Sequence, residues 1–277
     1  NVYAFDIPAL PESGFIAVGY TNSSNFDMTG NIDSSARAFI GRFDKDGHVI
    51  WKRIFGDTNF VELRSVTEAS PGIFYAAGTI YTSNGQKVYV AKFNADGDTL
   101  WTRAYGGSKE SGMSVLGADD GGVYFLGIAG SSEGDVHDWE TPPTGDSYAI
   151  NLWLVKLDAA GTPQWDSCYF GQSHTYMGLD MQRTKDNKII IGGEAFAPDG
   201  SGVSYSPFVL ALNNDGTRVM EKVYSLPGSR KQIRSIAVND DNSFTIAGLA
   251  GDQFLMTDTS YSGIHGSIDL WVATIDN

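Results

Sequence analysis

Apolar and polar residues alternate in short runs along the whole chain, with the period of two that is typical of half-buried β-strands. The segment KVYVAKFNA (87–95) shows this alternation, and short segments rich in Gly, Asp and Asn separate it from the neighbouring runs. No apolar run approaches the roughly 20 residues that span a bilayer. The pattern predicts an all-β protein built from many short strands, with no membrane span.

Two strand-like phrases recur along the chain, each five times. The copies of the first are GFIAVGYT (14–21), GIFYAAGTI (72–80), GVYFLGIAG (122–130), NKIIIGGEA (187–195) and NSFTIAGLA (242–250). The copies of the second are ARAFIGRFDKDGHVIWKRIFG (36–56), KVYVAKFNADGDTLWTRAYGG (87–107), NLWLVKLDAAGTPQWDSCYFG (151–171), SPFVLALNNDGTRVMEKVYSL (206–226) and the truncated DLWVATIDN (269–277). A repeat of about 55 residues made only of strands indicates a propeller.

The second repeat shows the unit most clearly. Strand-like segments at 60–69, 72–80, 87–95 and 98–107 are joined by hairpin signals, which predicts four antiparallel strands, or one blade. The chain is therefore expected to form one domain, a five-bladed β-propeller of four-stranded antiparallel blades. The expected blades are at about 1–56, 57–107, 108–171, 172–226 and 227–277.

The phase of the repeat predicts an incomplete last blade. Residues 1–6 align with first strands, whereas the last copy stops at Ile275-Asp276-Asn277, the end of a third strand. The fourth strand would lie upstream of Asn1, be lost, or be supplied by a neighbour. Because the chain starts with Asn rather than Met, we expect an upstream segment to have been removed and flanking domains there to be possible.

Aligned glycines and tryptophans predict packing rather than chemistry. Gly at one fixed point of a strand marks a bulge or the close approach of another backbone. Trp51, Trp101 and Trp165 each follow a turn glycine by four residues and are expected to pack over the turn or between neighbouring blades. Met220 takes this place in the fourth copy and is a tolerable apolar substitute. The aligned glycines are Gly19, Gly78, Gly127, Gly193 and Gly248.

The phrase apolar-x-apolar-x-Phe/Leu-Asp/Asn-x-Asp-Gly-x-x-x-Trp-x-x-x-Tyr/Phe-Gly-Gly resembles repeats of secreted bacterial β-propeller proteins of the delta-60 type. It is also similar to the Asp-box and to the tryptophan-docking motif of quinoprotein-like propellers. The Asp-box usually has Ser or Thr where Arg42, Lys92 and Lys156 stand here, and quinoprotein propellers have more blades. The resemblance therefore implies the fold and an exported protein that is extracellular, at the cell surface or periplasmic, and it transfers no catalytic residue or cofactor.

The charge and the cysteine content of the chain exclude some classes of partner and the formation of an intrachain disulfide. The formal net charge of −14 argues against nucleic acid and anionic membranes, which both require clusters of Lys and Arg. Cys168 is the single cysteine, so no intrachain disulfide forms, which is compatible with export.

Candidate ligand-binding residues are expected on the face that carries the long, dissimilar loops between second and third strands. Trp139 stands in a polar loop and suits stacking on a sugar or on a partner protein. Lys231 and Arg234 are cations in an acidic chain and point to an anionic or carbonyl-bearing ligand. The remaining candidates, at loops and at the expected mouth of the central channel, are Arg64, Glu110, His174, Tyr176, Tyr205 and Tyr261.

We expect a non-enzymatic binding module, with carbohydrate as the first ligand class and protein as the second, because no catalytic motif is present. The alternatives are a structural spacer and a glycoside hydrolase or lyase. The enzyme would use carboxylates on or near first strands, namely Asp6, Glu62, Asp180 and Asp240. No cofactor is expected; calcium at the acidic turns of Asp44, Asp46, Asp96 and Asp215 is possible, although turn formation explains these residues sufficiently.

Overall fold

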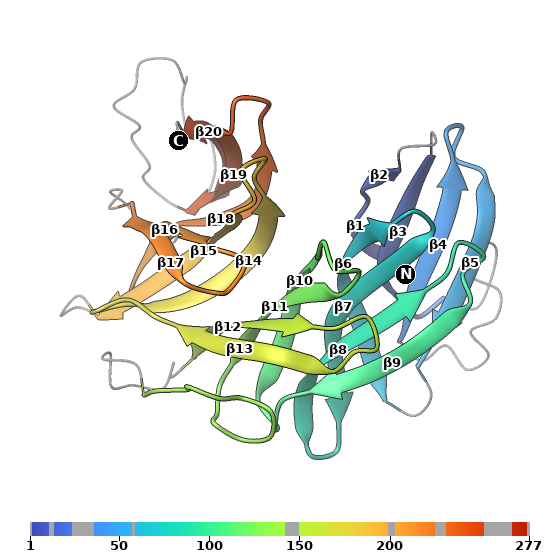
Figure 1. The fold of residues 1–277 in the computed structure, drawn as a ribbon, viewed down its shortest axis with the longest axis horizontal. Helices are drawn as coiled ribbons and strands as arrows, with labels where there is room; N and C mark the ends of the chain where they lie inside the picture. Colours follow the sequence, from blue (N-terminus) through green and yellow to red (C-terminus); the bar gives the residue numbers. More distant parts are fainter. Residues whose placement is uncertain are drawn as a thin grey trace. The chain divides into compact units, whose positions relative to one another are not determined.

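The computed structural model describes residues 2–10, 14–23, 36–56, 59–141, 150–198, 203–224, 231–251 and 268–275. These residues form β-strands and connecting turns and contain no helix, so none of them forms a helix that could cross a membrane. The strands form five antiparallel sheets that follow one another along the chain (Figure 1). The prediction of a five-bladed β-propeller is confirmed, and each sheet is one blade.

The first three blades contain thirteen strands. Blade 1 consists of β1 (Val2–Asp6), β3 (Gly14–Thr21), β4 (Arg37–Asp44) and β5 (Val49–Phe55), with the short β2 (Ala9–Leu10) paired to β3. Blade 2 consists of β6 (Phe60–Ser70), β7 (Ile73–Thr82), β8 (Gly85–Phe93) and β9 (Thr99–Tyr105). Blade 3 consists of β10 (Glu110–Gly117), β11 (Val123–Ala129), β12 (Asn151–Leu157) and β13 (Pro163–Tyr169).

The last two blades differ in their number of strands. Blade 4 consists of β14 (Thr175–Arg183), β15 (Ile189–Pro198), β16 (Val203–Leu212) and β17 (Arg218–Val223). The described residues of blade 5 form only β18 (Lys231–Val238), β19 (Phe244–Gly251) and β20 (Ile268–Ile275). The three strands formed by the described residues of the last blade agree with the phase of the sequence repeat.

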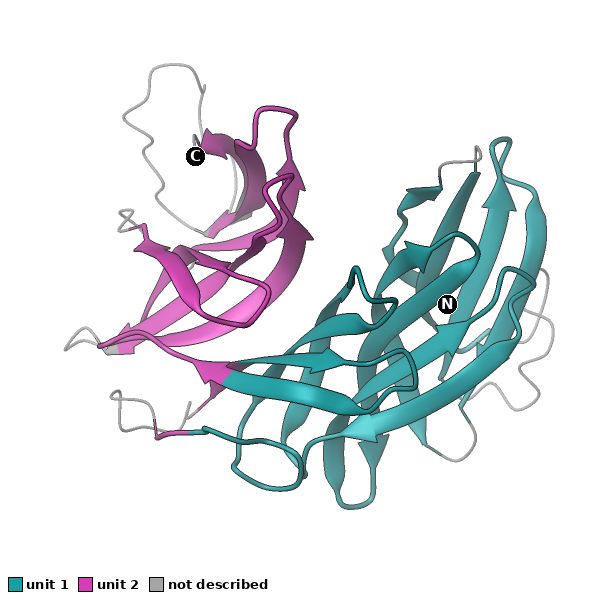
Figure 2. Cartoon of the chain, viewed as in Figure 1, with its two compact units in different colours: residues 1–139, 153–167 teal, residues 140–152, 168–277 magenta. Residues whose placement is uncertain are grey.

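The chain divides into two compact units (Figure 2). The first contains blades 1 and 2 and most of blade 3, and the second contains blades 4 and 5 with the ends of β12 and β13. A buried core within the first unit joins blades 1 and 2 through Val18, Ile40, Leu63 and Phe93. In the second unit Val209, Ile233 and Trp271 belong to a core shared by blades 4 and 5. A single domain over residues 1–277 stays a prediction.

Every first strand has a β-bulge at the same place, opposite the aligned glycine of the second strand. In blade 2, Leu63 pairs with Gly78 and Ser65 pairs with Ala77, so that Arg64 is the extra residue. A Cβ atom at Gly78 would overlap the carbonyl oxygen of Glu62. The glycines therefore serve close packing at the bulge, as predicted. The bulged residues of the five blades are Phe5, Arg64, Met113, Leu179 and Arg234.

The residue after the bulge bonds one blade to the next. Oδ2 of Asp6 accepts a hydrogen bond of 2.9 Å from the backbone amide of Val66, and Oδ2 of Asp180 accepts one of 2.8 Å from Ile236. Between blades 2 and 3, the Ser65 hydroxyl accepts from the amide of Val115 at 3.2 Å. Because each first strand is the edge strand of its blade, these amides point away from their own sheet, and a polar side chain from the preceding blade satisfies them.

The repeated tryptophans also connect neighbouring blades. Trp51 Nε1 donates to the carbonyl oxygen of Ala95 at 2.8 Å, and Trp101 Nε1 donates to that of Ala159 at 3.2 Å. A Cβ atom at Gly97 would meet the Trp51 ring at 2.6 Å, so only glycine lets the indole lie flat on this turn. Each indole thus docks on the turn between the third and fourth strands of the next blade, and the predicted packing role is confirmed for these two residues.

We expect Trp51→Ala to lower the free energy of unfolding by about 3 kcal/mol, since it removes a large interblade contact and leaves a cavity. Trp51→Phe keeps the ring contact but loses the hydrogen bond, at a cost of about 1 kcal/mol. Urea denaturation followed by circular dichroism measures both. Leu100→Ala, at a side chain that is 49% exposed, is the control and should change stability by under about 0.5 kcal/mol. An equal loss in Trp51→Ala and Leu100→Ala would contradict the docking role.

Candidate functional site

Five aromatic rings form a continuous row across β1, β3, β6 and β7 of the first two blades. Tyr3 stacks on Tyr20 at 4.8 Å between ring centroids, Phe5 lies 5.9 Å from Tyr20, and Tyr20 meets the edge of Phe60 at 5.3 Å. Phe60 in turn stacks on Tyr81 at 5.1 Å. We call these five residues the aromatic ladder. Tyr3 is 45% exposed and Phe5 48% exposed, so one end of the ladder is open to solvent.

A buried carboxylate lies at the Tyr81 end of the ladder. Oε1 of Glu62 accepts hydrogen bonds from Nε of Arg64 at 2.8 Å and from the Tyr81 hydroxyl at 3.4 Å, and Nη2 of Arg64 lies 2.6 Å away. Glu62 is 6% exposed, whereas Arg64 is half-buried. The charge of the carboxylate is therefore compensated by a guanidinium that itself reaches solvent.

Arg64 is the bulged residue of β6, and it meets the bulged residues of the blades on either side. Its Nη1 lies 3.3 Å from Sδ of Met113, and its guanidinium carbon lies 5.9 Å from the ring centre of Phe5. Cation–π attraction and the Glu62 ion pair together fix the guanidinium plane. The bulges thus bring Phe5, Arg64 and Met113, from three consecutive blades, into one group.

Asp6 follows Phe5 in β1, and its carboxyl group accepts the Val66 amide. Burial raises the pKa of Asp6 above its ordinary value, while the hydrogen bond from the Val66 amide acts in the opposite direction. Burial and the charge of Glu62 also raise the pKa of the Tyr81 hydroxyl. Blades 1 and 2 therefore contain one buried carboxyl group with a raised pKa and one carboxylate that is paired with an arginine.

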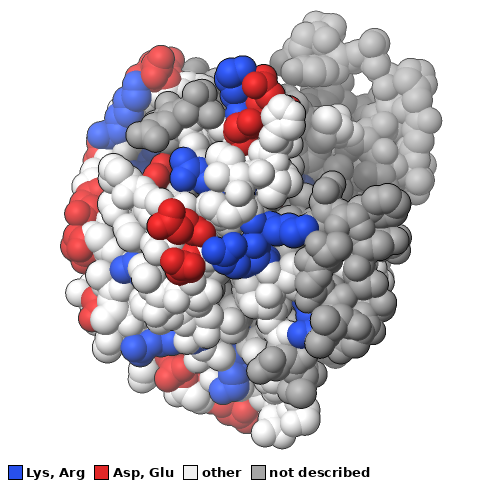
Figure 3. All heavy atoms as spheres, turned by 90° about the vertical axis from the view of Figure 1, so that its right-hand side faces the viewer, with Lys and Arg blue, Asp and Glu red and all other residues white. Residues whose placement is uncertain are grey.

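Charge on the face drawn in Figure 3 is mixed. Figure 3 views the molecule from the right-hand side of Figure 1 and shows acidic and basic side chains in small groups separated by neutral surface. The net charge of −14 does not gather into one acidic field on this face. Recognition here therefore depends on local contacts rather than on long-range attraction.

Glu110 was expected at the mouth of the channel, but it is completely buried. Its Oε1 accepts a hydrogen bond from the Ser131 hydroxyl at 2.9 Å, and its Oε2 accepts one from the Lys109 amide at 3.1 Å. Burial raises the pKa of this carboxyl group. Glu110 ties the link before β10 to the loop after β11, and a ligand would have to displace these segments to reach it.

Trp139 is half-buried rather than fully exposed. Its Nε1 donates to the carbonyl oxygen of Ala129 at 3.3 Å, which packs the indole on the end of β11. Nearby, His137 Nδ1 lies 2.7 Å from Oδ1 of Asp166, and this carboxylate raises the pKa of the imidazole. The ring of Trp139 remains a surface feature of blade 3, and its role in ligand binding stays a prediction.

The other expected binding residues lie in the second unit. Tyr176 is fully buried, and its hydroxyl group donates a hydrogen bond of 2.7 Å to Oε1 of Glu221. His174 and Glu221 line an open cavity of about 520 Å³. Burial lowers the pKa of His174. Lys231 is fully buried as well. Arg234 is the exposed bulged residue of β18, Tyr205 packs edge-on against Phe196 at 5.2 Å, and Tyr261 lies outside the described residues. The ligand roles of these residues stay predictions.

Two of the four expected catalytic carboxylates take other positions. Asp180 bonds blade 4 to blade 5, and Asp240 is an exposed turn residue with its Oδ1 2.6 Å from Lys185 Nζ. The ladder was not predicted as a unit. The signal for it was the position of Tyr3 and Tyr20 directly opposite each other beside the aligned Gly19, which only the strand register reveals.

The acidic turns are explained by hairpin chemistry. Oδ1 of Asp44 accepts hydrogen bonds from the amides of Asp46 and His48, both at 2.9 Å, and Gly47 has a φ of +85°. Asp44, Asp46 and His48 place possible ligand atoms within 4.8 Å of one another. Since the same oxygens already complete the turn, calcium binding here stays a prediction.

No protein-family model matches the chain, and neither does any curated protein sequence. Among solved structures, an endo-arabinase from Bacteroides thetaiotaomicron is similar with a TM-score of 0.51 and 12% identity, over 99% of this chain and 93% of the other. A β-xylosidase/α-arabinofuranosidase from a compost metagenome has a TM-score of 0.45 and 11% identity, over 99% and 91%. Synechocystis apocarotenoid oxygenase has a TM-score of 0.44 and 12% identity, over 85% and 52%.

The prediction of a non-enzymatic binding module is wrong by this comparison. The structure that matches nearly the full length of both proteins is that of an endo-arabinase, and this finding overturns the prediction. At 12% identity the likeness establishes the fold alone. Candidate functional residues must therefore be chosen from the geometry of this chain's own site. The prediction rested on the absence of a catalytic sequence motif, and such an absence does not exclude catalysis.

We expect Asp6→Asn to change how stability depends on pH. The native carboxyl group has a raised pKa, so the native state binds more protons than the unfolded state, and the free energy of unfolding falls as pH rises from the ordinary value of 3.8 through the native pKa. Asparagine can still accept the Val66 amide but does not titrate. The variant should therefore gain stability relative to the parent across this range, as measured by urea denaturation at a series of pH values.

Asp44→Asn is the control of opposite sign. The amide of His48 lowers the pKa of Asp44, so its contribution to stability is present above pH 3.8 and is lost as pH falls through the native pKa. This variant should lose stability relative to the parent as pH rises. Parallel curves for Asp6→Asn and its parent would show that burial does not affect Asp6 as described.

Proposed function

We propose that this protein is a glycoside hydrolase and that its first substrate class is an arabinose-containing polysaccharide. The observation that carries the proposal is the Glu62–Arg64–Tyr81 network at one end of an open row of aromatic rings. The fold likeness to an endo-arabinase supplies the substrate class.

Glycoside hydrolysis requires two carboxyl groups in different protonation states. Asp6 has a raised pKa and is the proposed general acid, which donates its proton to the leaving oxygen. Glu62 is the proposed base or nucleophile, and the ion pair with Arg64 positions its side chain. Because a general acid acts only while protonated, activity should decline as pH rises above the pKa of Asp6.

The aromatic ladder offers a platform for successive sugar units. Sugar rings stack on exposed aromatic faces, and Tyr3 and Phe5 are about half exposed. The ladder leads from these open rings to Tyr81, which contacts Glu62. A chain of sugars along this row would place one glycosidic bond beside the carboxylate.

We also retain three finer proposals from the repeat pattern. The blades belong to the repeat type of secreted bacterial propellers, the protein acts outside the cytoplasm at the cell surface or in the periplasm, and it needs no cofactor. Separately, we propose that the long loops contact a partner protein. Hydrolysis does not require this contact. Fractionation of the native host tests the location, and assays with added calcium or chelator test the need for a cofactor.

We expect Glu62→Gln to lower kcat on arabinan by about 1,000-fold or more, because glutamine keeps the shape but cannot act as a base or nucleophile. Release of reducing ends measures the reaction. Asp180→Asn is the matched control for Asp6→Asn, since both aspartates accept an interblade amide but only Asp6 adjoins the ladder. Hydrolysis should be lost in Asp6→Asn and kept in Asp180→Asn.

Three results would reject the assignment. The first is no hydrolysis of arabinan by the parent protein, the second is full activity of Glu62→Gln, and the third is equal loss in Asp6→Asn and Asp180→Asn. The unfolding midpoint of each variant shows whether a loss of activity is a loss of fold.

A separate prediction concerns the ladder. Tyr3→Ala should raise KM for long arabino-oligosaccharides about tenfold and leave kcat nearly unchanged, because Tyr3 lies at the open end of the row. Kinetics on oligosaccharides of increasing length measure the effect, which should vanish for disaccharides. A fall in kcat with unchanged KM would contradict a role in substrate binding.

A further inference from the structure

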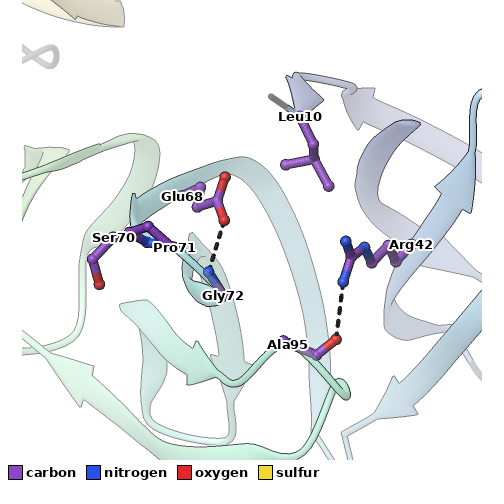
Figure 4. Close-up of a pocket in the computed structure, with 7 residues that line it drawn as sticks. All are labelled: Leu10, Arg42, Glu68, Ser70, Pro71, Gly72 and Ala95. Atoms are coloured by element: carbon purple, nitrogen blue, oxygen red, sulfur yellow. Dashed lines mark hydrogen bonds between the residues drawn. The ribbon is translucent and has the colours of Figure 1, made fainter. Parts of the chain in front are cut away.

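A second pocket lies between blades 1 and 2, away from the Glu62 site (Figure 4). Its volume is about 520 Å³. Glu62 stands near the start of β6 and Glu68 near its end, so six residues of extended strand, or roughly 20 Å, separate the two regions. The lining residues are Leu10, Arg42, Glu68, Ser70, Pro71, Gly72 and Ala95.

The pocket holds one cation and one anion that do not pair with each other. Arg42 and Glu68 lie on opposite walls in Figure 4, and of the ion pairs formed by the described residues none joins them. Nη1 of Arg42 donates to the carbonyl oxygen of Ala95 over a long 3.4 Å, and Oε1 of Glu68 accepts from the Gly72 amide at 2.8 Å. The remaining guanidinium donors and the second carboxylate oxygen are available to a ligand.

Apolar groups complete the walls. The side chain of Leu10, on the short strand β2, extends toward the pocket from the side opposite Ala95, and Pro71 lies beside Glu68 (Figure 4). A ligand that fits must therefore present a negative group, a positive group and a small apolar portion close together. Free α-amino acids have this combination.

We propose that this pocket binds a small zwitterion of the amino-acid class, independently of the hydrolase site. The carboxylate of the ligand pairs with Arg42, whose planar guanidinium suits bidentate contact with a carboxylate. The ammonium group pairs with Glu68. An aliphatic side chain packs on Leu10 and Pro71, so L-leucine is the probe with which to begin.

The next blade offers a matched comparison. Lys92 has the position of Arg42 and donates to the carbonyl oxygen of Ala159 at 2.8 Å, as Arg42 does to Ala95. In the register of the sheets Glu68 pairs with Phe74 and Gly117 pairs with Val123, so Gly117 stands where Glu68 would be. The equivalent place between blades 2 and 3 therefore has the cation but lacks the carboxylate.

Isothermal titration calorimetry with L-leucine, glycine, 4-aminobutyrate and N-acetyl-L-leucine amide tests the proposal. L-leucine should bind, glycine more weakly, and the uncharged amide not at all. Arg42→Gln and Glu68→Gln should each weaken L-leucine at least tenfold, since each removes one charged partner. The side-chain amide oxygen in Glu68→Gln can still accept the Gly72 amide, so the turn is kept, and Lys92→Gln should bind as the parent does.

Several outcomes would overturn the proposal: no binding of L-leucine at millimolar concentration, unchanged binding in Arg42→Gln, or an equal loss in Lys92→Gln. Tighter binding of 4-aminobutyrate than of L-leucine would also reject an α-amino acid. Leu10→Glu keeps both original charges and should weaken binding at least tenfold by repelling the carboxylate, which tests the site if a charge variant does not fold. Glu62→Gln should bind L-leucine unchanged, so this result is separate from hydrolase activity.

Discussion

The structure depends on one constraint, seen in blades 2, 3 and 5: the backbone amide two residues past the first-strand bulge donates out of its own sheet. A buried amide without a partner is costly, so the preceding blade must offer an acceptor at that point. Asp6, Ser65 and Asp180 provide it. The same bulge lets the chain change direction and aims Arg64 at its neighbours Phe5 and Met113, so the feature that joins the blades also assembles the candidate site.

The surroundings of the bulge explain why Asp180 is a poor catalytic candidate and Asp6, at the equivalent position, is a good one. Asp180 is held by an interblade bond in the second unit, where the described aromatic contacts are separate pairs rather than a row. Asp6 makes the same bond, but it directly follows Phe5, whose ring contacts Tyr20 and the Arg64 guanidinium. Asp6 and Asp180 are thus the same residue type at equivalent positions of blades 1 and 4. Only the surroundings of Asp6 make it a candidate for the proposed chemistry.

The two ends of β6 illustrate how one rigid strand can serve two proposed sites. Glu62 and Glu68 belong to the same strand and to the same blade, yet one is paired with an arginine and the other faces one across a pocket. The second arginine, Arg42, belongs to the neighbouring blade and faces the pocket while Trp51 makes the shorter bond to the shared carbonyl of Ala95. Blade packing thus decides which charges are neutralised and which remain open.

The sequence by itself determined the blades. Its repeated phrases, turn glycines and tryptophans are local signals, and local propensity with periodic burial is enough to place the strands of blade 2 and the short last blade. It could not determine the site, because Tyr3, Tyr20, Phe60 and Tyr81 come from four strands whose alignment depends on register and bulges. The sequence could not determine burial either. Glu110, Tyr176 and Lys231 are polar residues near loops, and only tertiary packing shows that they are enclosed.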